Sequence, residues 1–204
     1  EQGQLKEAER AELLALLERH GAYLADSRYY LPQENHGVFE DRALLYLGYA
    51  LRRDDWVRLA VQRVEQQWRF LFTAQGVCIE NSYTYQRVNK DLFLEIASIL
   101  KARHSSQGQV LQEGVLLAEE FMGYALLPDG TSPPYGDSQR DDYTMLYPID
   151  PRGARAYACG RPQADCPSQR SLVYPDAGYF IGREFWQPPR EDLGRADPFW
   201  VMLR

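Results

Sequence analysis

The helical periodicity of the first 126 residues constrains the fold of this 204-residue chain more than any other feature. Apolar residues recur there every three to four positions, which is the spacing of one face of a helix. Short polar turns separate five such segments. The predicted helices run from about Glu7 to Ala25, Val38 to Arg52, Asp55 to Phe72, Tyr83 to Ala102 and Gln109 to Leu126.

These helices differ in how far their apolar residues extend around the axis. The second is apolar nearly all round at residues 43–47, and the fourth is similarly rich at 92–96, which is typical of helices surrounded by neighbours. The third carries a single apolar stripe, formed by Trp56, Ala60, Val64, Trp68 and Leu71. Alternating inner and outer helices predict stacked hairpins, and hence a mainly α fold in which residues 1–127 form part of an α/α toroid. A closed toroid needs more hairpins, so we expect further helices upstream.

The pattern changes after Leu127. Proline and glycine punctuate an irregular stretch, which we interpret as a linker over residues 128–170. Short strand-like runs follow at 171–174, 178–181 and 199–202, with a turn at 176–178. We therefore expect residues 171–204 to begin an antiparallel β-sandwich domain that the chain does not complete.

Charge and hydropathy exclude several classes of protein. The net charge of −6 argues against a general nucleic-acid or membrane-surface binder, because both need a field that attracts phosphates. No apolar run approaches the roughly 18 residues of a transmembrane helix. An acidic polysaccharide is still compatible with this charge, provided that the attraction is local to a cleft.

Cysteine usage gives a weaker constraint. Three cysteines are too few for a disulfide scaffold. Cys159 and Cys166 flank a loop and could pair in an oxidising compartment, whereas Cys78 fits a buried thiol. No histidine lies beside them in the sequence, so a zinc site is not expected.

The first polar constellation is Asn35 and His36, between Glu34 and Gly37 at the start of the second helix. Free backbone N–H groups and the helix dipole favour an anion at such a position. The alternative is purely structural, with Asn35 as the helix cap and His36 as a first-turn residue.

The second constellation opens the fourth helix, where Asn81 or Ser82 can serve as the cap and Tyr85 falls in the first turns. Packing is the ordinary role of a tyrosine there. Because both constellations open helices predicted to be inner ones, both could project to the same end of a toroid, where a groove would form.

A third constellation consists of residues 130–138 and 174–179. As bare sequence these are turns, in which Pro and Gly set the dihedral angles and Asp137 and Asp176 bond local backbone.

Taken together and in this order, four short motifs resemble the heparinase II/III family of polysaccharide lyases, which includes related alginate lyases. The motifs are Asn35–Gly37, Glu80–Ser82 with Tyr85, Gly136–Ser138 and Pro175–Tyr179. The resemblance covers most of the chain from about residue 30 to 183. It implies an α/α toroid followed by a β-sandwich-like domain, in agreement with the helical pattern.

The resemblance also implies a β-elimination on a uronic acid. Removal of the C5 proton adds negative charge to an anionic carboxylate, which must first be neutralised by hydrogen-bond donors. Asn35 and His36 match the family's residues for this role. Tyr85 matches the catalytic tyrosine, which protonates the departing O4 and, depending on the substrate's stereochemistry, also removes the C5 proton. No metal or other cofactor is implied.

Further candidate contacts to an acidic polysaccharide are Glu80, Asn81, Arg87, Tyr30 and Tyr135. Aromatic side chains in polar surroundings can stack on sugar rings, and Tyr29, Tyr83 and Tyr85 also belong to this group. A solvent-facing helix position is the alternative for Arg87. The choice among alginate, heparan-type, hyaluronan-type and bacterial exopolysaccharides stays open, as does the oligomeric state.

Two departures from the family limit the transfer. Gln86 stands where relatives often have His, and no match to the family's β-domain His or Tyr follows Arg183. We therefore expect the remaining catalytic residues beyond Arg204, and little activity from these residues alone. The expected location is periplasmic or secreted.

Two other functions compete with the lyase. A glycoside hydrolase on the same toroid needs two carboxylates, one of them protonated. The candidates are Glu34, Glu40, Asp41, Glu80, Glu119, Glu120 and Asp137, and no pair stands out. A non-catalytic polysaccharide-binding or assembly protein would use the same aromatic residues without turnover.

Overall fold

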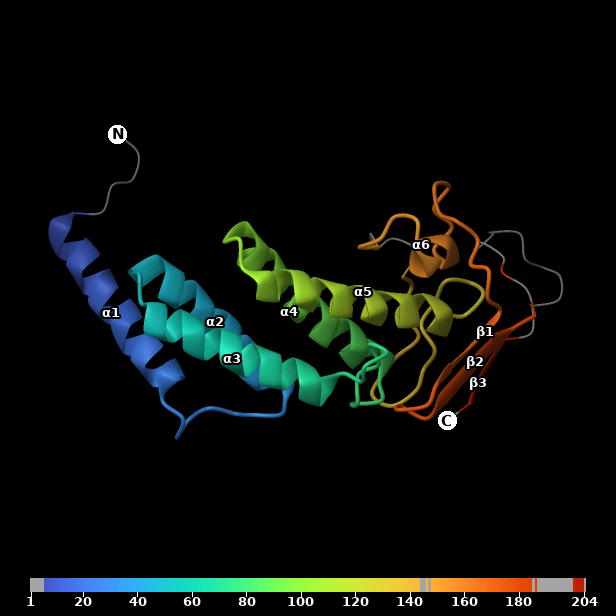
Figure 1. Ribbon diagram of the computed structural model, residues 1–204, viewed down its shortest axis with the longest axis horizontal. Helices are drawn as coiled ribbons and strands as arrows, with labels where there is room; N and C mark the ends of the chain where they lie inside the picture. The colour runs from blue at the N-terminus through green and yellow to red at the C-terminus, as the bar shows by residue number, and fades with distance from the viewer. Residues whose placement is uncertain (1–5, 144–145, 147, 185, 187–199, 204) are drawn as a thin grey trace. The chain divides into compact units, whose positions relative to one another are not determined.

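The computed structural model describes residues 6–143, 146, 148–184, 186 and 200–203. The chain forms two compact units, Glu1–Phe70 and Leu71–Arg204, whose helices and strands are labelled in Figure 1. Within the described residues, none of the helices combines the length and the apolarity that a bilayer span requires.

Unit one contains α1 (Glu7–Ala25), α2 (Asn35–Leu51) and α3 (Asp54–Leu71), the last of which ends at the boundary. Glycines allow the helices to approach closely. A Cβ on Gly21 of α1 would lie 2.0 Å from the Trp56 ring of α3, and one on Gly48 of α2 would lie 2.7 Å from Val57. The stripe predicted on α3 is confirmed as a packing face, because Trp56, Ala60 and Val64 are buried.

One expectation about unit one is not met within the described residues. The second helix buries Val38, Leu44 and Leu45, but Phe39 and Tyr46 are exposed by 41% and 47%, so α2 is not enclosed on all sides in the described part of the chain. Arg63 is a charged residue of α3 that is nevertheless buried. Its guanidinium donates to the carbonyl oxygens of Leu24 and Ala25 at the end of α1, at 2.8 and 3.1 Å.

Unit two begins with a hairpin of α4 (Tyr83–Ala102) and α5 (Ser106–Ala125). The turn between them places His104 in the left-handed region, at φ 58°. Gly108 allows α5 to touch α4, since a Cβ there would lie 2.6 Å from the backbone nitrogen of Lys101. The hairpin core is apolar and consists of Leu92, Phe93, Ile96, Leu100, Leu111, Val115 and Ala118.

Strands β1 (Ser171–Tyr174), β2 (Tyr179–Arg183) and β3 (Trp200–Leu203) form an antiparallel sheet in the order β1-β2-β3. Tyr174 pairs with Tyr179, and Gly182 with Val201. The three predicted strands are thus confirmed within a residue or two, although Phe199 and Arg204 lie outside the described residues.

Residues 128–170 contain the short helix α6 (Ala154–Ala158) between turns. Figure 1 shows α6 and the sheet near the end of the hairpin at which α5 finishes. A Cβ on Gly123 of α5 would lie 2.3 Å from the backbone nitrogen of Arg155, so α6 packs directly on α5. An aromatic-rich core joins these parts and includes Tyr83, Phe121, Tyr124, Tyr143, Tyr174, Tyr179 and Trp186.

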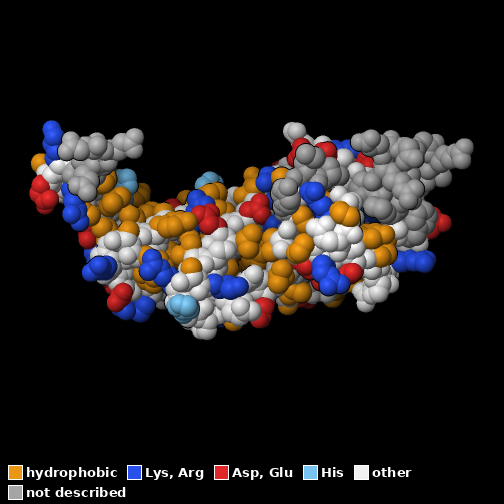
Figure 2. Space-filling model, turned by 90° about the horizontal axis from the view of Figure 1, so that it is seen from above, with side chains coloured by type: hydrophobic (Ala, Val, Ile, Leu, Met, Phe, Trp, Pro, Cys, Tyr) orange, Lys and Arg blue, Asp and Glu red, His pale blue; other side chains and the backbone are white. Residues whose placement is uncertain are grey.

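The surface carries both signs of charge. Figure 2 shows acidic and basic side chains interspersed among hydrophobic ones on the face that it presents. Exposed large hydrophobic residues in unit one include Leu13, Leu14, Leu16, Tyr23 and Leu31. Any attraction for an anionic ligand must therefore come from a local group of side chains and not from the charge of the whole surface.

Candidate functional site

The first constellation lies at the N-terminus of α2, as predicted from sequence. Glu34 is the N-cap, with extended dihedral angles, and Asn35 is the first helical residue. The structural alternative in which Asn35 is the cap is therefore wrong. Asn35 is half-buried, whereas the His36 side chain is 69% exposed, with Nδ1 3.2 Å from the Glu34 carboxylate. Both side chains lie at the helix end that favours anions.

The second constellation lies at the N-terminus of α4. Ser82 caps the helix by accepting a hydrogen bond from the backbone N–H of Tyr85 at 3.3 Å. Ser138, from the predicted turn at residues 136–138, is 2.9 Å from the Ser82 hydroxyl and accepts from the Thr84 N–H at 3.1 Å. Tyr85 is half-buried in the first turn. These two hydrogen bonds hold the backbone N–H groups of Tyr85 and of its neighbour Thr84.

Glu80 and Asn81 precede this cap and are tied to other parts of unit two. Asn81 adopts a left-handed conformation, at φ 53°. Its Oδ1 accepts from the Tyr179 hydroxyl of β2 at 3.2 Å, and Asn89 donates to the Glu80 carboxylate at 3.3 Å. A Cβ on Gly136 would lie 2.1 Å from the Asn81 carbonyl oxygen, so only glycine allows this approach.

A pocket of about 460 Å³ forms where these residues meet. Its lining combines the second and third constellations with the sheet and consists of Glu80, Asn81, Pro133, Pro134, Tyr135, Gly136, Tyr179, Trp200 and Met202. Three of the predicted contact residues, Glu80, Asn81 and Tyr135, are thus brought together. Sequence reasoning missed the contributions of Tyr179 as a lining residue and of Trp200.

Tyr83, grouped with the sugar-stacking aromatics, does not reach the surface. It is fully buried, its hydroxyl donates to the Met122 carbonyl oxygen at 3.1 Å, and its ring meets Tyr143 edge-on at 4.9 Å. The prediction for Tyr83 is wrong, because the first residue of α4 faces α5 rather than solvent.

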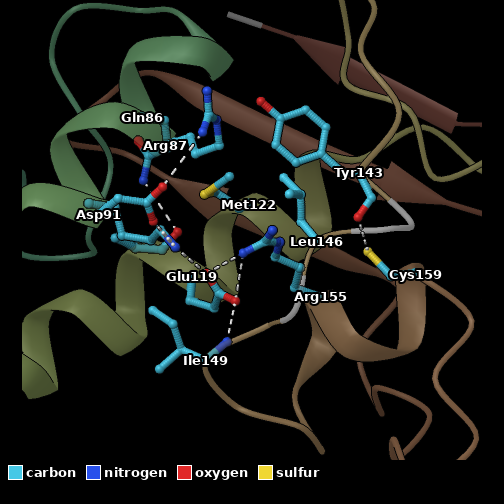
Figure 3. Close-up of polar contacts among 12 residues, drawn as sticks. Gln86, Arg87, Asp91, Glu119, Met122, Tyr143, Leu146, Ile149, Arg155 and Cys159 are labelled. Atoms are coloured by element: carbon cyan, nitrogen blue, oxygen red, sulfur yellow. Dashed lines mark hydrogen bonds and ion pairs between the residues drawn. The ribbon is translucent and has the colours of Figure 1, made fainter. Parts of the chain in front are cut away.

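Arg87, two positions after Tyr85, extends along α4. Its guanidinium is 3.7 Å from the Asp91 carboxylate, one turn further on. Burial raises the pKa of the Tyr143 hydroxyl, and the charge of Arg87 beside it opposes that rise. Figure 3 shows Arg87, Asp91 and Tyr143 in one polar region of unit two.

Tyr30, the remaining predicted contact, belongs to the interior of unit one. Its hydroxyl donates to Asp41 at 2.8 Å and accepts from Gln67 at 3.1 Å, and its ring lies 4.0 Å from the Arg63 guanidinium carbon. Burial raises the pKa of Asp41 to about 8, although Tyr30 and Arg63 oppose that rise. No local pattern in the sequence indicated that Gln67 is part of this cluster.

A second buried ionic cluster, shown in Figure 3, was also missed. Glu119 of α5 is 2.9 Å from the Lys90 ammonium of α4 and 2.8 Å from the Arg155 guanidinium of α6, and it accepts from the Ile149 N–H at 2.9 Å. Burial raises the pKa of the Glu119 carboxyl, but the charges of Lys90 and Arg155 outweigh burial and hold it below its usual 4.5. Lys90, a lysine within the apolar stretch of α4, was the sequence feature that could have indicated this cluster.

The predicted site residues are divided between the two units. Asn35, His36 and Tyr30 belong to unit one, whereas Tyr85, Glu80, Asn81, Arg87 and Tyr135 belong to unit two. Among the described residues, no group of three or more His, Cys, Asp or Glu side chains is arranged to hold a metal ion.

The cysteines are all free thiols. The pairing considered for Cys159 and Cys166 is not formed, since Cys159 is buried and Cys166 is exposed. Burial raises the pKa of the Cys78 thiol to about 11, which agrees with its interpretation as a buried structural residue.

Comparison with known proteins places this arrangement in a family. The family model described as "Heparinase II/III N-terminus" matches residues 3–154. The heparan sulfate lyase HepC from Pedobacter heparinus has a similar fold, with a TM-score of 0.70 and 22% identity over 88% of this chain. The heparinase III BT4657 gene product gives a TM-score of 0.69 and 17% identity over 86% of this chain.

The chain spans 30% of the length of the first of these structures and 29% of the second. A search of curated protein sequences gives no match. At such low identity the two structures establish the fold, and they confirm a mainly helical chain leading into an antiparallel sheet. The family model covers three quarters of the sequence, and on that ground the chain belongs to the heparinase II/III family.

Proposed function

We propose that this chain forms part of a polysaccharide lyase that cleaves a uronic-acid-containing polysaccharide by β-elimination. Membership of the heparinase II/III family is the observation that carries the proposal. Two structures of similar fold bear the names heparan sulfate lyase and heparinase III, which supports an acidic polysaccharide as the substrate class.

The reaction needs a carboxylate-binding group, a base that takes the C5 proton and a donor that protonates O4. The C5–H bond breaks, its electron pair forms the C4–C5 double bond, and the C4–O4 bond breaks as O4 takes up a proton. Charge develops on the uronate carboxylate during the first step, so fixed donors near it lower the barrier. In this proposal Asn35 and His36 neutralise that carboxylate. Their position at the amide-rich end of α2, with His36 exposed, supports this role.

Tyr85 protonates O4 and, on substrates of suitable stereochemistry, removes the C5 proton as tyrosinate. The cap formed by Ser82 and reinforced by Ser138 supports a fixed position for the first turn of α4. The neighbouring pocket, with Tyr135, Tyr179 and Trp200 in its lining, offers aromatic surface against which a sugar ring can stack.

The hydrolase alternative loses two of its candidate carboxylates. Glu119 is buried between two cations, and Asp41 is buried against Tyr30 in unit one. Neither is available to a substrate, whereas inverting and retaining hydrolases both need a pair of accessible carboxyl groups.

The test uses the protein that contains these residues, incubated with a panel of uronic polysaccharides. Elimination creates an unsaturated sugar that absorbs in the ultraviolet, and hydrolysis creates new reducing ends without that absorbance. Replacing Tyr85 with Phe should lower kcat by about 100-fold or more while substrate binding persists, since general acid–base groups contribute at least that much.

Tyr23→Phe is the matched control, because Tyr23 is an exposed tyrosine of α1 outside the proposed site. It should leave turnover unchanged. Absence of unsaturated product from every polysaccharide would sink the lyase proposal, and reducing ends without ultraviolet absorbance would favour the hydrolase. Binding without either product would favour the non-catalytic alternative.

A further inference from the structure

The loop that leads into Asn35 and His36 is bonded to α3 through one buried side chain. Gln67 is 2% exposed, and both ends of its amide are occupied by this loop. Its Oε1 accepts from the Gln33 N–H at 2.9 Å. Its Nε2 donates to the Tyr30 hydroxyl at 3.1 Å and lies 3.4 Å from the Leu31 carbonyl oxygen.

Helix α2 also forms hydrogen bonds with this loop. Glu40 accepts from the Leu31 N–H at 3.2 Å, and Asp41 accepts from the Tyr30 hydroxyl at 2.8 Å. Leu31 is therefore bonded through its N–H to α2 and through its carbonyl to α3. Several hydrogen bonds to one loop, centred on the buried amide of Gln67, rigidify the segments that they join.

Gly37 explains how the loop can lie so close to α2. A Cβ at this position would be 2.1 Å from the Leu31 carbonyl oxygen and 2.2 Å from Gln67 Nε2. The third residue of the Asn35-His36-Gly37 motif therefore makes room for the amide that fixes the loop. Gln33, which is held by Gln67, adopts a left-handed φ of 67° two residues before Asn35.

We propose that Gln67 is a positioning residue for Asn35 and His36. The inference rests on the lyase function proposed above, in which these two side chains neutralise the uronate carboxylate. Gln67 acts through the backbone, because its bond to Gln33 fixes the chain immediately before α2 begins. Groups that stabilise developing charge lose their effect when they are displaced by about 1 Å, which can cost about 100-fold in rate.

The first measurement compares kinetics of Gln67→Met with those of Gln66→Met. Gln66 is the adjacent, exposed residue of α3, so the control repeats the substitution without touching the loop. We expect kcat to fall about 10- to 100-fold in Gln67→Met with a smaller change in KM, since misplacement affects the transition state more than ground-state binding. Gln66→Met should behave as the unaltered protein.

The second measurement does not depend on activity. NMR signals of the His36 ring, identified by their loss in His36→Gln, report its surroundings. They should shift or broaden in Gln67→Met but not in Gln66→Met, and the Gln33 amide should exchange faster with solvent. If Gln67→Met does not fold, Gln67→Glu replaces it, because a carboxylate can still accept from Gln33 but cannot donate to Tyr30 or Leu31.

The outcomes separate the inference from the proposed function. Unchanged His36 signals or unchanged kcat in the folded Gln67 variants would overturn the positioning role, whatever the substrate. A parent protein that makes no unsaturated product would overturn the lyase proposal, while the His36 signals would still decide whether Gln67 positions this end of α2.

Discussion

Removal of the Glu119 carboxylate should strongly destabilise unit two. The side chain is 4% exposed and contacts two cations that are themselves buried, Lys90 at 2% and Arg155 at 3% exposure. Glu119→Gln keeps the size of the side chain and an oxygen for the Ile149 N–H. It removes the carboxylate that pairs with Arg155 and one of the two that pair with Lys90, whose ammonium is also 2.8 Å from Asp91.

The expected magnitude follows from the cost of leaving buried charge unpaired. Breaking a buried ion pair by removing one partner costs about 3–5 kcal/mol. With a denaturant dependence of about 2 kcal/mol per molar urea, a loss of about 4 kcal/mol lowers the unfolding midpoint by about 2 M. Because the folded-state pKa of Glu119 lies below its usual 4.5, this stabilisation is complete above that pH and is lost as the pH falls through the lowered pKa.

Urea unfolding at neutral pH, followed by circular dichroism and by amide exchange of α4 and α5, measures the effect. Glu120→Gln is the matched control, since Glu120 is the adjacent and exposed acid of the same helix. Its midpoint should stay within the error of the parent's. A Glu119→Gln midpoint equal to that of Glu120→Gln would refute the view that this carboxylate compensates Lys90 and Arg155.

Two further predictions concern Asp41 and Gly136. Burial raises the pKa of Asp41 from its usual 3.8 to about 8, so its contribution to stability is greatest below pH 4 and is lost as the pH rises to about 8. Asp41→Asn should therefore flatten the dependence of the unfolding free energy on pH. The control Asp54→Asn, at an exposed residue of α3, should leave that dependence unchanged. Gly136→Ala should cost more than about 1 kcal/mol in urea unfolding, because its positive φ and its contact with Asn81 both resist a Cβ. Gly178→Ala has a similar φ but no atom within 4 Å, so an equal loss in both variants would show that the Asn81 contact is unimportant.

The helices and caps were predictable because their signals are local. The bounds of α1 and α4 agree with the apolar periodicity, and Ser82 was recognised as one of two caps for α4 from its residue type alone. The start of α2 was placed at Val38 rather than Asn35. The reason is that its first turn is polar and its cap, Glu34, accepts no side-chain hydrogen bond of the usual kind.

The parts that escaped prediction depend on contacts between distant residues. Gln67 lies 34 positions from Gln33, and Arg155 lies 36 from Glu119. A buried glutamine and an exposed one, such as Gln67 and Gln66, look alike in sequence, since the difference arises only when the loop folds over α3. The pocket beside Asn81 likewise needs Tyr179, which is 98 positions away.

Residues that are far apart in the sequence meet around the start of α4, and this has a consequence for the order of folding. The hairpin of α4 and α5 is built from contacts that are close in sequence, which form quickly. Ser138 and Tyr179, by contrast, reach Ser82 and Asn81 across 56 and 98 positions. We therefore expect the helical hairpin to assemble first during synthesis and the pocket to be closed last, once β3, which supplies Trp200 and Met202, has left the ribosome.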